Sequence, residues 1–280
     1  MPQKRKRLII AAAIILILCA LSAWGFALKP INYNISSKKL DKGVRIVFIS
    51  DLHNCFYGDT HNSKLIDEVN KAKPDIVIFG GDVLDAWGGT KYAIRLMKDL
   101  SRSYPCCYTP GNHEEMRDDT EEFYEEVRKI CPVLLGDHEK FNVNGQDICV
   151  YGAIDSIAWG KHDTQLNECF AALDEKCYNI LLAHQPEQID SYLGKDIRAD
   201  KGFDLILSGH AHGGQWRLPK LLDQGLYAPD QGIFPDYTTG MYQYDDTTHI
   251  ISRGLARPLR MIFIPRIFNR PELSIINIGK

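Results

Sequence analysis

Five short polar clusters dominate this sequence, and each stands at the end of an apolar run of the kind that forms a buried strand. The runs cover residues 44–50, 75–80, 106–109, 179–183 and 205–208. Their polar ends read S-D-L-H, G-D, G-N-H-E, A-H and G-H-A-H-G-G. In open α/β sheets, ligands bind just outside the carboxyl ends of the strands. We therefore expect the fold to bring these five polar strand ends together at one site.

Helices are expected between these strands, because apolar residues recur there at helical spacing. The patterns cover residues 65–72, 92–100, 119–130 and 166–173, with Ser63 as the predicted cap of the first helix. Turn signals at 144–145 (Asn-Gly) and 245–246 (Asp-Asp) predict two hairpins in the second half, before a final strand over 273–278. Parallel units followed by hairpins predict an α/β fold with mixed sheets and helices outside.

The polar side chains at the strand ends are of the types that bind divalent metals. They are Asp51, His53, Asp82, Asn112, His113, His184, His210 and His212. Imidazoles and carboxylates bind zinc, manganese and iron, and an asparagine supplies a neutral oxygen. One carboxylate can bridge two metals about 3.5–4 Å apart, the arrangement used to hydrolyse phosphate esters. The neighbouring glycines let the backbone turn sharply and leave room for a substrate.

Taken singly, each cluster has an ordinary structural explanation. An aspartate after a strand is a common helix cap, and Gly-Asp is a common turn. A lone buried histidine is more often a packed core residue than a ligand. The G-H-x-H cluster is more specific, since an exposed turn gains no stability from two imidazoles. The ordered set of five clusters favours a functional site.

The order D-x-H, G-D, G-N-H-E, H, G-H-x-H resembles that of the calcineurin-like metallophosphoesterases. The resemblance covers roughly residues 44–278, and every metal-ligand position is filled. It is closest to a membrane-anchored bacterial branch, as indicated by G-H-A-H-G-G-Q at 209–215, G-L-Y-A-P at 225–229 and F-N-R-P-E-L at 268–273. The resemblance implies a four-layer α/β/β/α sandwich of two mixed sheets.

The resemblance also implies a role for each residue. Asp51, His53 and His212 would hold one metal, Asn112, His184 and His210 the other, and Asp82 would bridge both. A hydroxide between the metals would be the nucleophile, and His113 would stabilise the transition state or protonate the leaving oxygen. The two divalent ions would be manganese, zinc or iron. Purple acid phosphatases carry a metal-binding tyrosine where this chain has Asp85, so no tyrosinate centre is expected.

Late arginines are candidates for contact with a substrate phosphate, which arginine binds in bidentate fashion. Arg253 and Arg266 are the predicted contacts, and Arg270 lies in the same region. A structural or surface salt bridge explains them equally well. Four further histidines, at 61, 138, 162 and 249, match no motif and are expected to be ordinary surface or packing residues.

Residues 1–29 differ from the rest. A basic cluster at 4–7 precedes Leu8–Leu28, which is 21 residues without a charge. As a helix this run is about 31 Å long at ~1.5 Å per residue, enough to span a bilayer. We therefore predict a transmembrane anchor over 1–29 and a catalytic domain over 30–280. The basic end stays cytoplasmic, so the domain is expected outside the cell membrane. A cleaved signal peptide is the alternative.

Charge and cysteine content narrow the function classes. The chain has 33 basic and 36 acidic residues, and five of the basic ones lie within residues 1–29. The remaining 28 basic and 36 acidic residues give the predicted domain a net charge of −8, so no nucleic-acid partner is expected. Seven cysteines follow the anchor, and no two of them form a C-x-x-C pair. We therefore expect most of them to be small buried side chains. The sequence leaves open whether Cys169 and Cys177 form a disulfide bond.

These observations predict a membrane-anchored phosphoesterase with two metals. Its expected substrate is a phosphodiester or pyrophosphate of the envelope or of a lipid-linked molecule, because the short tether keeps the domain near the membrane. A general phosphomonoesterase or nucleotide hydrolase is the alternative enzyme. A catalytically silent metal-binding scaffold is the alternative outside enzymes, although such a scaffold has no need of His113.

Overall fold

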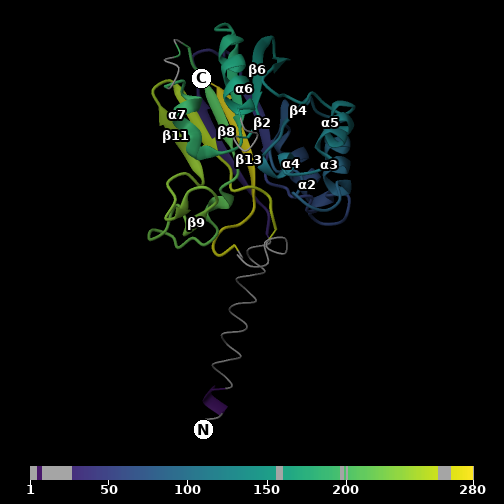
Figure 1. Cartoon of the computed structure of the whole chain (residues 1–280), viewed down its shortest axis with the longest axis vertical. Coiled ribbons are helices and arrows are strands. Elements are labelled where there is room, and N and C mark those ends of the chain that lie inside the picture. Colours follow the sequence, from purple (N-terminus) through teal and green to yellow (C-terminus); the bar gives the residue numbers. More distant parts are fainter. Residues whose placement is uncertain are drawn as a thin grey trace.

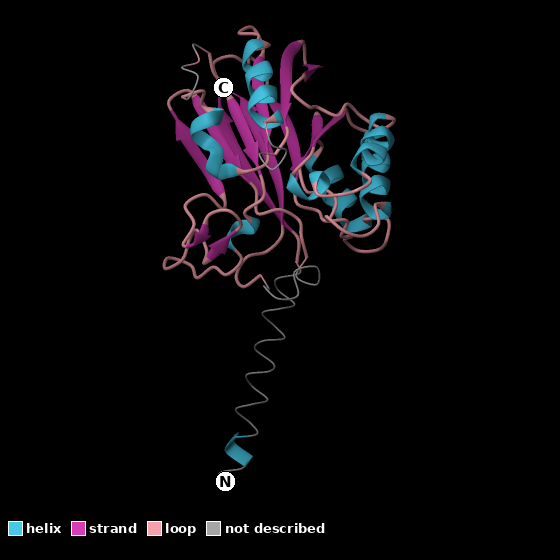
Figure 2. Ribbon diagram, viewed as in Figure 1, coloured by secondary structure: helices cyan, strands magenta, loops and turns pink. Residues whose placement is uncertain are grey.

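Two mixed β-sheets form the centre of the molecule (Figures 1 and 2). The computed structural model describes residues 5–7, 27–155, 160–195, 199, 201–257 and 266–279. The first sheet contains, in spatial order, β1 (Lys29–Ser36), β13 (Glu272–Gly279), β2 (Val44–Ile49), β3 (Ile76–Gly80) and β4 (Cys106–Thr109). β13 runs parallel to β1 and antiparallel to β2, whereas β2, β3 and β4 are parallel to one another.

The second sheet has a parallel centre and antiparallel edges. Its spatial order is β11 (Gly240–Tyr244), β12 (Thr247–Ile251), β8 (Leu205–Ser208), β7 (Tyr178–Ala183), β6 (Gln146–Ala153) and β5 (His138–Val143). The hairpins β5–β6 and β11–β12 form the two edges, and both turns lie where the sequence predicts them. A separate two-stranded sheet pairs β9 (Tyr227–Ala228) with β10 (Gly232–Ile233).

Helices cover the outer face of each sheet. On the first sheet these are α2 (Ser63–Ala72), α3 (Lys91–Ser101), the short α4 (Asn112–Glu115) and α5 (Thr120–Arg128). On the second they are α6 (Lys161–Ala171) and α7 (Ile189–Tyr192), with 3₁₀ turns η1 (Pro186–Gln188) and η2 (His212–Gly214) at strand ends.

Three hydrophobic clusters hold these layers together. One lies between the first sheet and its helices, and includes Val47, Phe79 and Leu96. The second fills the space between the two sheets with alternate residues of their strands, such as Phe48 and Ile180. The third joins the second sheet to α6 and α7. Alternate residues of a strand point to opposite faces, so a strand such as β2 contributes to two clusters.

The structure corrects one expected helix cap. α2 begins at Ser63, but its N-cap is Asn62, which has a left-handed backbone. The Asn62 side chain accepts a hydrogen bond from the backbone amide of Tyr57 instead of capping the helix. The prediction that Ser63 is the cap is therefore wrong: Asn62 holds the cap position, and its side-chain oxygen is bound within the loop before α2.

β1 was not expected from the sequence. Most of its side chains are exposed or half-buried, so it lacks the apolar run that predicts a strand. Its register is determined by pairing with β13, which lies near the other end of the chain. Tyr33 pairs with Ile276, and the Tyr33 hydroxyl donates a hydrogen bond of 2.8 Å to Glu272 Oε1.

The predicted transmembrane helix falls almost entirely outside the described residues, which begin again at Ala27. Within the described part of the chain, no helix is both long enough and apolar enough to cross a bilayer. Cys169 and Cys177 are both buried and free. Their thiols point to the carbonyl oxygen of Gly152 and to Asp174 Oδ2, respectively, so the bridge between them is not formed.

Candidate metal centre

The carboxyl ends of strands from both sheets meet at one site. Hydrogen bonds across the gap between the sheets hold them together. The amide of His210, after β8, donates to Asp51 Oδ1, after β2, at 2.8 Å. His184 Nδ1, after β7, lies 3.1 Å from the carbonyl oxygen of Gly80 in β3. This leaves His184 Nε2 directed into the space where the strand ends converge.

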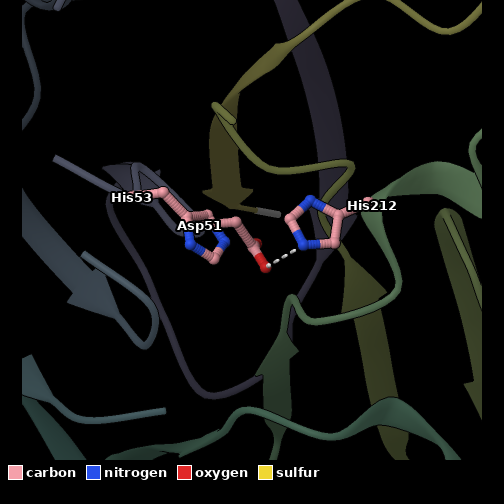
Figure 3. A group of neighbouring side chains, drawn as sticks. All are labelled: Asp51, His53 and His212. Carbon is pink, nitrogen blue, oxygen red and sulfur yellow. Dashed lines mark ion pairs between the residues drawn. The ribbon is translucent and has the colours of Figure 1, made fainter. Parts of the chain in front are cut away.

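Asp51, His53 and His212 form one cluster of potential metal ligands (Figure 3). One ligand atom from each lies within 4.8 Å of the others. His212 Nε2 is 3.9 Å from Asp51 Oδ1, and the rings of His53 and His212 stack with centroids 5.1 Å apart. All three side chains are buried. Burial lowers the pKa of His53 to about 4, so its imidazole is neutral at physiological pH, as a ligand must be.

Asp82, His184 and His210 form a second cluster beside the first. Asp82 Oδ2 lies 3.2 Å from His184 Nε2 and 3.8 Å from His53 Nε2, so this carboxylate stands between the two clusters. Asn112 Oδ1 lies 3.0 Å from His210 Nδ1 and adds an amide oxygen to the second cluster. The seven side chains thus lie in two groups with Asp82 in common.

The donor atoms of these groups fit divalent cations. Asp51 Oδ2 and His53 Nε2 are buried and have no hydrogen-bond partner among the described residues. Buried polar atoms are almost always paired, so two such atoms within one cluster indicate a cation site. Carboxylate, imidazole and amide donors suit zinc, manganese and iron.

Two glycines leave room for the ligands. Gly81 has φ +83°, and a Cβ there would lie 2.2 Å from His184 Nδ1. Gly254 has φ +67°, and a Cβ there would lie 2.4 Å from the Cβ of Asp51. Gly254 belongs to no motif that the sequence analysis used, because its contact with Asp51 joins distant parts of the chain.

His113 lies at the edge of the site and is partly exposed. Its ring meets that of His53 edge to face, with centroids 4.5 Å apart, and its Nε2 is 3.9 Å from Asp82 Oδ2. Its Nδ1 lies 3.2 Å from Asp85 Oδ1 and 3.1 Å from the backbone nitrogen of Ala86. Burial alone would lower the pKa of His113, but the hydrogen bond with Asp85 and the charges of Asp82 and Asp85 raise it to about 9.

Two carboxylates that support the ligands were not assigned a role from the sequence. Glu114 is fully buried and accepts hydrogen bonds from the amides of Asp82 (2.9 Å), Leu84 (2.7 Å) and Gly111 (2.9 Å). It therefore joins the ends of β3 and β4. Burial and the charge of Asp82 raise the pKa of Glu114 to about 7. Only the motif G-N-H-E pointed toward this residue.

Asp230 is the second of these carboxylates. Its Oδ2 lies 2.8 Å from His210 Nε2, on the side of the ring opposite Asn112. Carboxylates that bind the second nitrogen of a ligand histidine fix its orientation and increase its basicity. Asp230 lies in an exposed loop, and no spacing in the sequence links it to His210.

The late arginines contact protein groups. Arg253 Nε donates to Thr239 Oγ1 at 3.0 Å. Arg266 is 2% exposed, and its Nη2 lies 3.2 Å from His212 Nδ1. Contact of either arginine with a substrate stays a prediction.

The four histidines outside the motifs lie apart from the clusters of potential ligands among the described residues. His61 and His138 are exposed, and His138 stacks on Tyr151. His162 and His249 are buried, with ring nitrogens 2.6 Å from the Ile154 carbonyl oxygen and 2.9 Å from Ser208 Oγ, respectively.

Comparison with known proteins gives a consistent family match. The family described as "Calcineurin-like phosphoesterase" matches residues 44–214. An uncharacterized metallophosphoesterase of Helicobacter pylori is 30% identical over 233 residues, which are 80% of this chain and 58% of that protein. A Caenorhabditis elegans protein named as a metallophosphoesterase is 32% identical over 217 residues, 72% of this chain and 43% of its own length.

A third relative, from Bos taurus, carries the name "Transmembrane protein with metallophosphoesterase domain". It is 26% identical over 227 residues, which are 76% of this chain and 48% of that protein. The chain thus spans about half the length of these relatives.

Proposed function

The chain belongs to the calcineurin-like phosphoesterase family, and we propose that it is a hydrolase that cleaves a phosphoester bond with two divalent metal ions. The observation that supports this activity is the pair of buried ligand clusters that share Asp82, with His113 beside them. A scaffold without catalysis would have no use for a partly exposed imidazole at that position.

We assign each metal to one cluster. Asp51, His53 and His212 would hold the first ion; Asn112, His184 and His210 would hold the second; Asp82 would contact both. When bound, the ions supply positive charge to the phosphoryl oxygens and make water a nucleophile near neutral pH. Asp230 and Glu114 hold the ligands in place through His210 and through the amides at the ends of β3 and β4.

His113 is proposed to protonate the leaving oxygen. Its Nδ1 faces Asp85 and the amide of Ala86, so its Nε2 is the atom directed toward the clusters. A positioned imidazole is a suitable general acid near neutral pH. Asp85 orients the ring and favours its protonated form.

We further propose that the substrate is a phosphodiester or pyrophosphate attached to a lipid or to the cell envelope. Leu28, the last residue of the uncharged run, is buried in the hydrophobic core, and β1 begins at the next residue. If the uncharged run before Ala27 spans a membrane in a single pass, no linker separates the catalytic domain from the bilayer. The basic cluster at 4–7 favours an orientation with the domain on the extracytoplasmic side. The name of the Bos taurus relative agrees with membrane attachment.

The test is turnover by full-length protein reconstituted with Mn²⁺. Its substrates would be a chromogenic phosphodiester, a chromogenic phosphomonoester and a lipid-linked sugar diphosphate in vesicles. We expect Asp82→Asn to abolish turnover and to lower metal content, since it removes the shared ligand. Asp67→Asn, an exposed change on α2, is the matched control and should behave as the unmodified protein. Full turnover with normal metal content in Asp82→Asn would refute the proposed site.

A further inference from the structure

Large apolar side chains are exposed together on one part of the surface. Ten large hydrophobic residues are exposed among the described residues, and six of them lie between 216 and 234. With Phe268 they form what we call the apolar rim: Trp216, Leu218, Leu221, Tyr227, Ile233, Phe234 and Phe268. Leu221 is 75% exposed, and Ile233 and Phe234 are each 67% exposed. Soluble surfaces seldom gather such residues, and a group of them usually marks an interaction site.

Backbone contacts join the segments that carry the rim. Trp216 forms a β-bridge with Ile267, next to Phe268. The amide of Leu221 donates to the carbonyl oxygen of Leu218. Tyr227 of β9 pairs with Ile233 of β10. In Figure 1, β9 and its flanking loops lie together at the side of the globular domain opposite the C-terminus.

The rim is built on the loop that carries the metal ligands. It begins four residues after His212, and the amide of Leu226 returns to donate to the carbonyl oxygen of Gly214 at 2.9 Å. Asp230, which contacts His210 Nε2, lies between β9 and β10. A partner surface that covers the rim therefore lies close to the metal ligands.

The rim also lies where the uncharged N-terminal run meets the domain. Arg270, two residues after Phe268, donates from Nε to the carbonyl oxygen of Ala27 at 2.9 Å. Its Nη2 donates to the carbonyl oxygen of Leu28 at 2.7 Å. The 21 uncharged residues thus end beside the rim, and a bilayer that holds them would lie against this surface.

We propose that the apolar rim is a membrane-docking surface, which inserts its side chains into the interface of the same bilayer that holds the uncharged run before Ala27. This inference rests on the proposed membrane anchorage and substrate. Docking would hold the metal centre at the lipid surface, where a lipid-linked phosphoester can enter without leaving the membrane. Aromatic and aliphatic side chains on one face are the usual means of such attachment.

Charge plays a small part in this docking. Lys220 is exposed within the rim segment, but so are Asp223 and Asp230. Because both signs are present, burial of apolar surface rather than attraction to anionic lipid would supply the binding free energy. Docking is therefore expected on vesicles of zwitterionic phosphatidylcholine, with little dependence on salt.

Tryptophan fluorescence gives a direct test. Trp216 becomes the sole tryptophan when Trp24, Trp87 and Trp159 are replaced by phenylalanine. This full-length protein would be reconstituted in phosphatidylcholine vesicles, with or without bromine on the acyl chains. Brominated lipid quenches only an indole that touches it. Docking predicts quenching of Trp216 in brominated vesicles, and equal emission from both kinds of vesicle would overturn the proposal.

Paired variants connect the contact to catalysis. The double variant Leu221→Asp/Phe234→Asp should lose the quenching and turn over a vesicle-embedded phosphodiester about tenfold more slowly. Its turnover of a soluble phosphodiester should be unchanged. Met241→Asp, an exposed apolar residue on β11, is the control and should keep the quenching.

The outcomes separate the two proposals. Quenching without any phosphodiester turnover would refute the proposed activity and leave docking intact. Normal turnover without quenching would refute docking alone. Self-association that the rim substitutions abolish, in protein whose Trp216 is not quenched, would assign the rim to a second copy of the chain and overturn the membrane assignment.

Discussion

At the scale of single residues, the metal centre depends on backbone conformations that most side chains avoid. Five of the seven proposed ligands have positive φ: Asp51 (49°), His53 (49°), Asp82 (51°), His210 (64°) and His212 (47°). Each such residue costs about 1–3 kcal/mol and persists only where the surroundings hold it. Hydrogen bonds such as His53 N to the carbonyl oxygen of Asp82 supply that restraint.

The role of His113 can be tested by truncation. His113→Ala should reduce turnover by ~10²–10⁴-fold, because it removes a positioned acid, while leaving both metals bound. Turnover and metal content would be measured on the same sample. His61→Ala, at an exposed histidine without a motif, should change neither. Loss of metal from the His113 variant would show that this residue is a ligand.

Glu114 is expected to act as a positioning residue. A glutamine at this site brings an amide donor against backbone amides that now donate to both carboxylate oxygens. Glu114→Gln should destabilise the fold by about 1–3 kcal/mol, because at least one buried amide loses its partner. Metal affinity should fall by about 10–100-fold, the usual effect of removing a group that orients ligands.

Titration with Mn²⁺ and thermal unfolding would measure the two effects of Glu114→Gln separately. Glu121→Gln, at a residue in the first turn of α5, is the matched control. Unchanged metal affinity in the Glu114 variant would mean that the residue supports the fold without positioning the ligands.

The proposed ligands were named from the sequence alone, whereas the residues that support them could not be. Asp51, His53 and His210 lie in short motifs whose residue types and spacing are chemically specific. Asp230 and Gly254 act through contacts with His210 and Asp51 that link distant parts of the chain. Such contacts depend on how loops fold, and periodicity carries no information about them.

At the scale of elements, local pattern predicted most of the strands and helices that are buried on at least one face, but not the short helices α4 and α7. It failed at β1, an edge strand whose exposed residues show no apolar run and whose partner, β13, lies at the other end of the domain. It also failed at the start of α2, where contact with Tyr57 places Asn62 at the cap. The first failure arises where a distant partner outweighs local preference, and the second where a side chain binds within its own loop.

The turn after β3 offers a sharp test of how the elements shape the site. Gly81→Ala and Gly145→Ala both place a side chain at similar positive φ, +83° and +81°. A Cβ at Gly81 would strike the His184 ring, whereas nothing lies within 4 Å of a Cβ at Gly145. Each variant should lose about 1 kcal/mol of stability from backbone strain.

Only Gly81→Ala should also lose metal and turnover, because only there is a ligand displaced. Chemical denaturation and metal analysis of both variants would show this difference. Equal metal content and equal turnover in the two variants would mean that His184 can move without harm to the centre.

At the scale of the whole molecule, the bound metals should stabilise the fold, since their proposed ligands come from both sheets. An ion present at 100 times its dissociation constant contributes about 2.7 kcal/mol. Removing it with a chelator should therefore lower the Tm by roughly 5–10 °C in a domain of this size. Added Mn²⁺ or Zn²⁺ should restore the Tm. Asp82→Asn should respond much less to the chelator, and an equal response would place the stabilising ion elsewhere.

The orientation of the chain is a second property of the whole molecule. The basic cluster at 4–7 predicts that the domain is exported. A phosphatase reporter fused after Lys280 should be active outside the cytoplasmic membrane. In intact protoplasts, added protease should digest the domain, and protection from digestion would reverse the predicted topology.

The position of β13 also governs when the protein can fold. This strand follows all the others along the chain, yet it lies between β1 and β2, where Ile275 pairs with Val47. While the chain emerges from the ribosome, β1 and β2 have no common partner, and the edge of β2 stays open. Strands that wait for distant partners fold slowly and are prone to wrong pairing. The first sheet is thus complete only once β13 has paired with both β1 and β2, so its closure has to wait for the last of these strands.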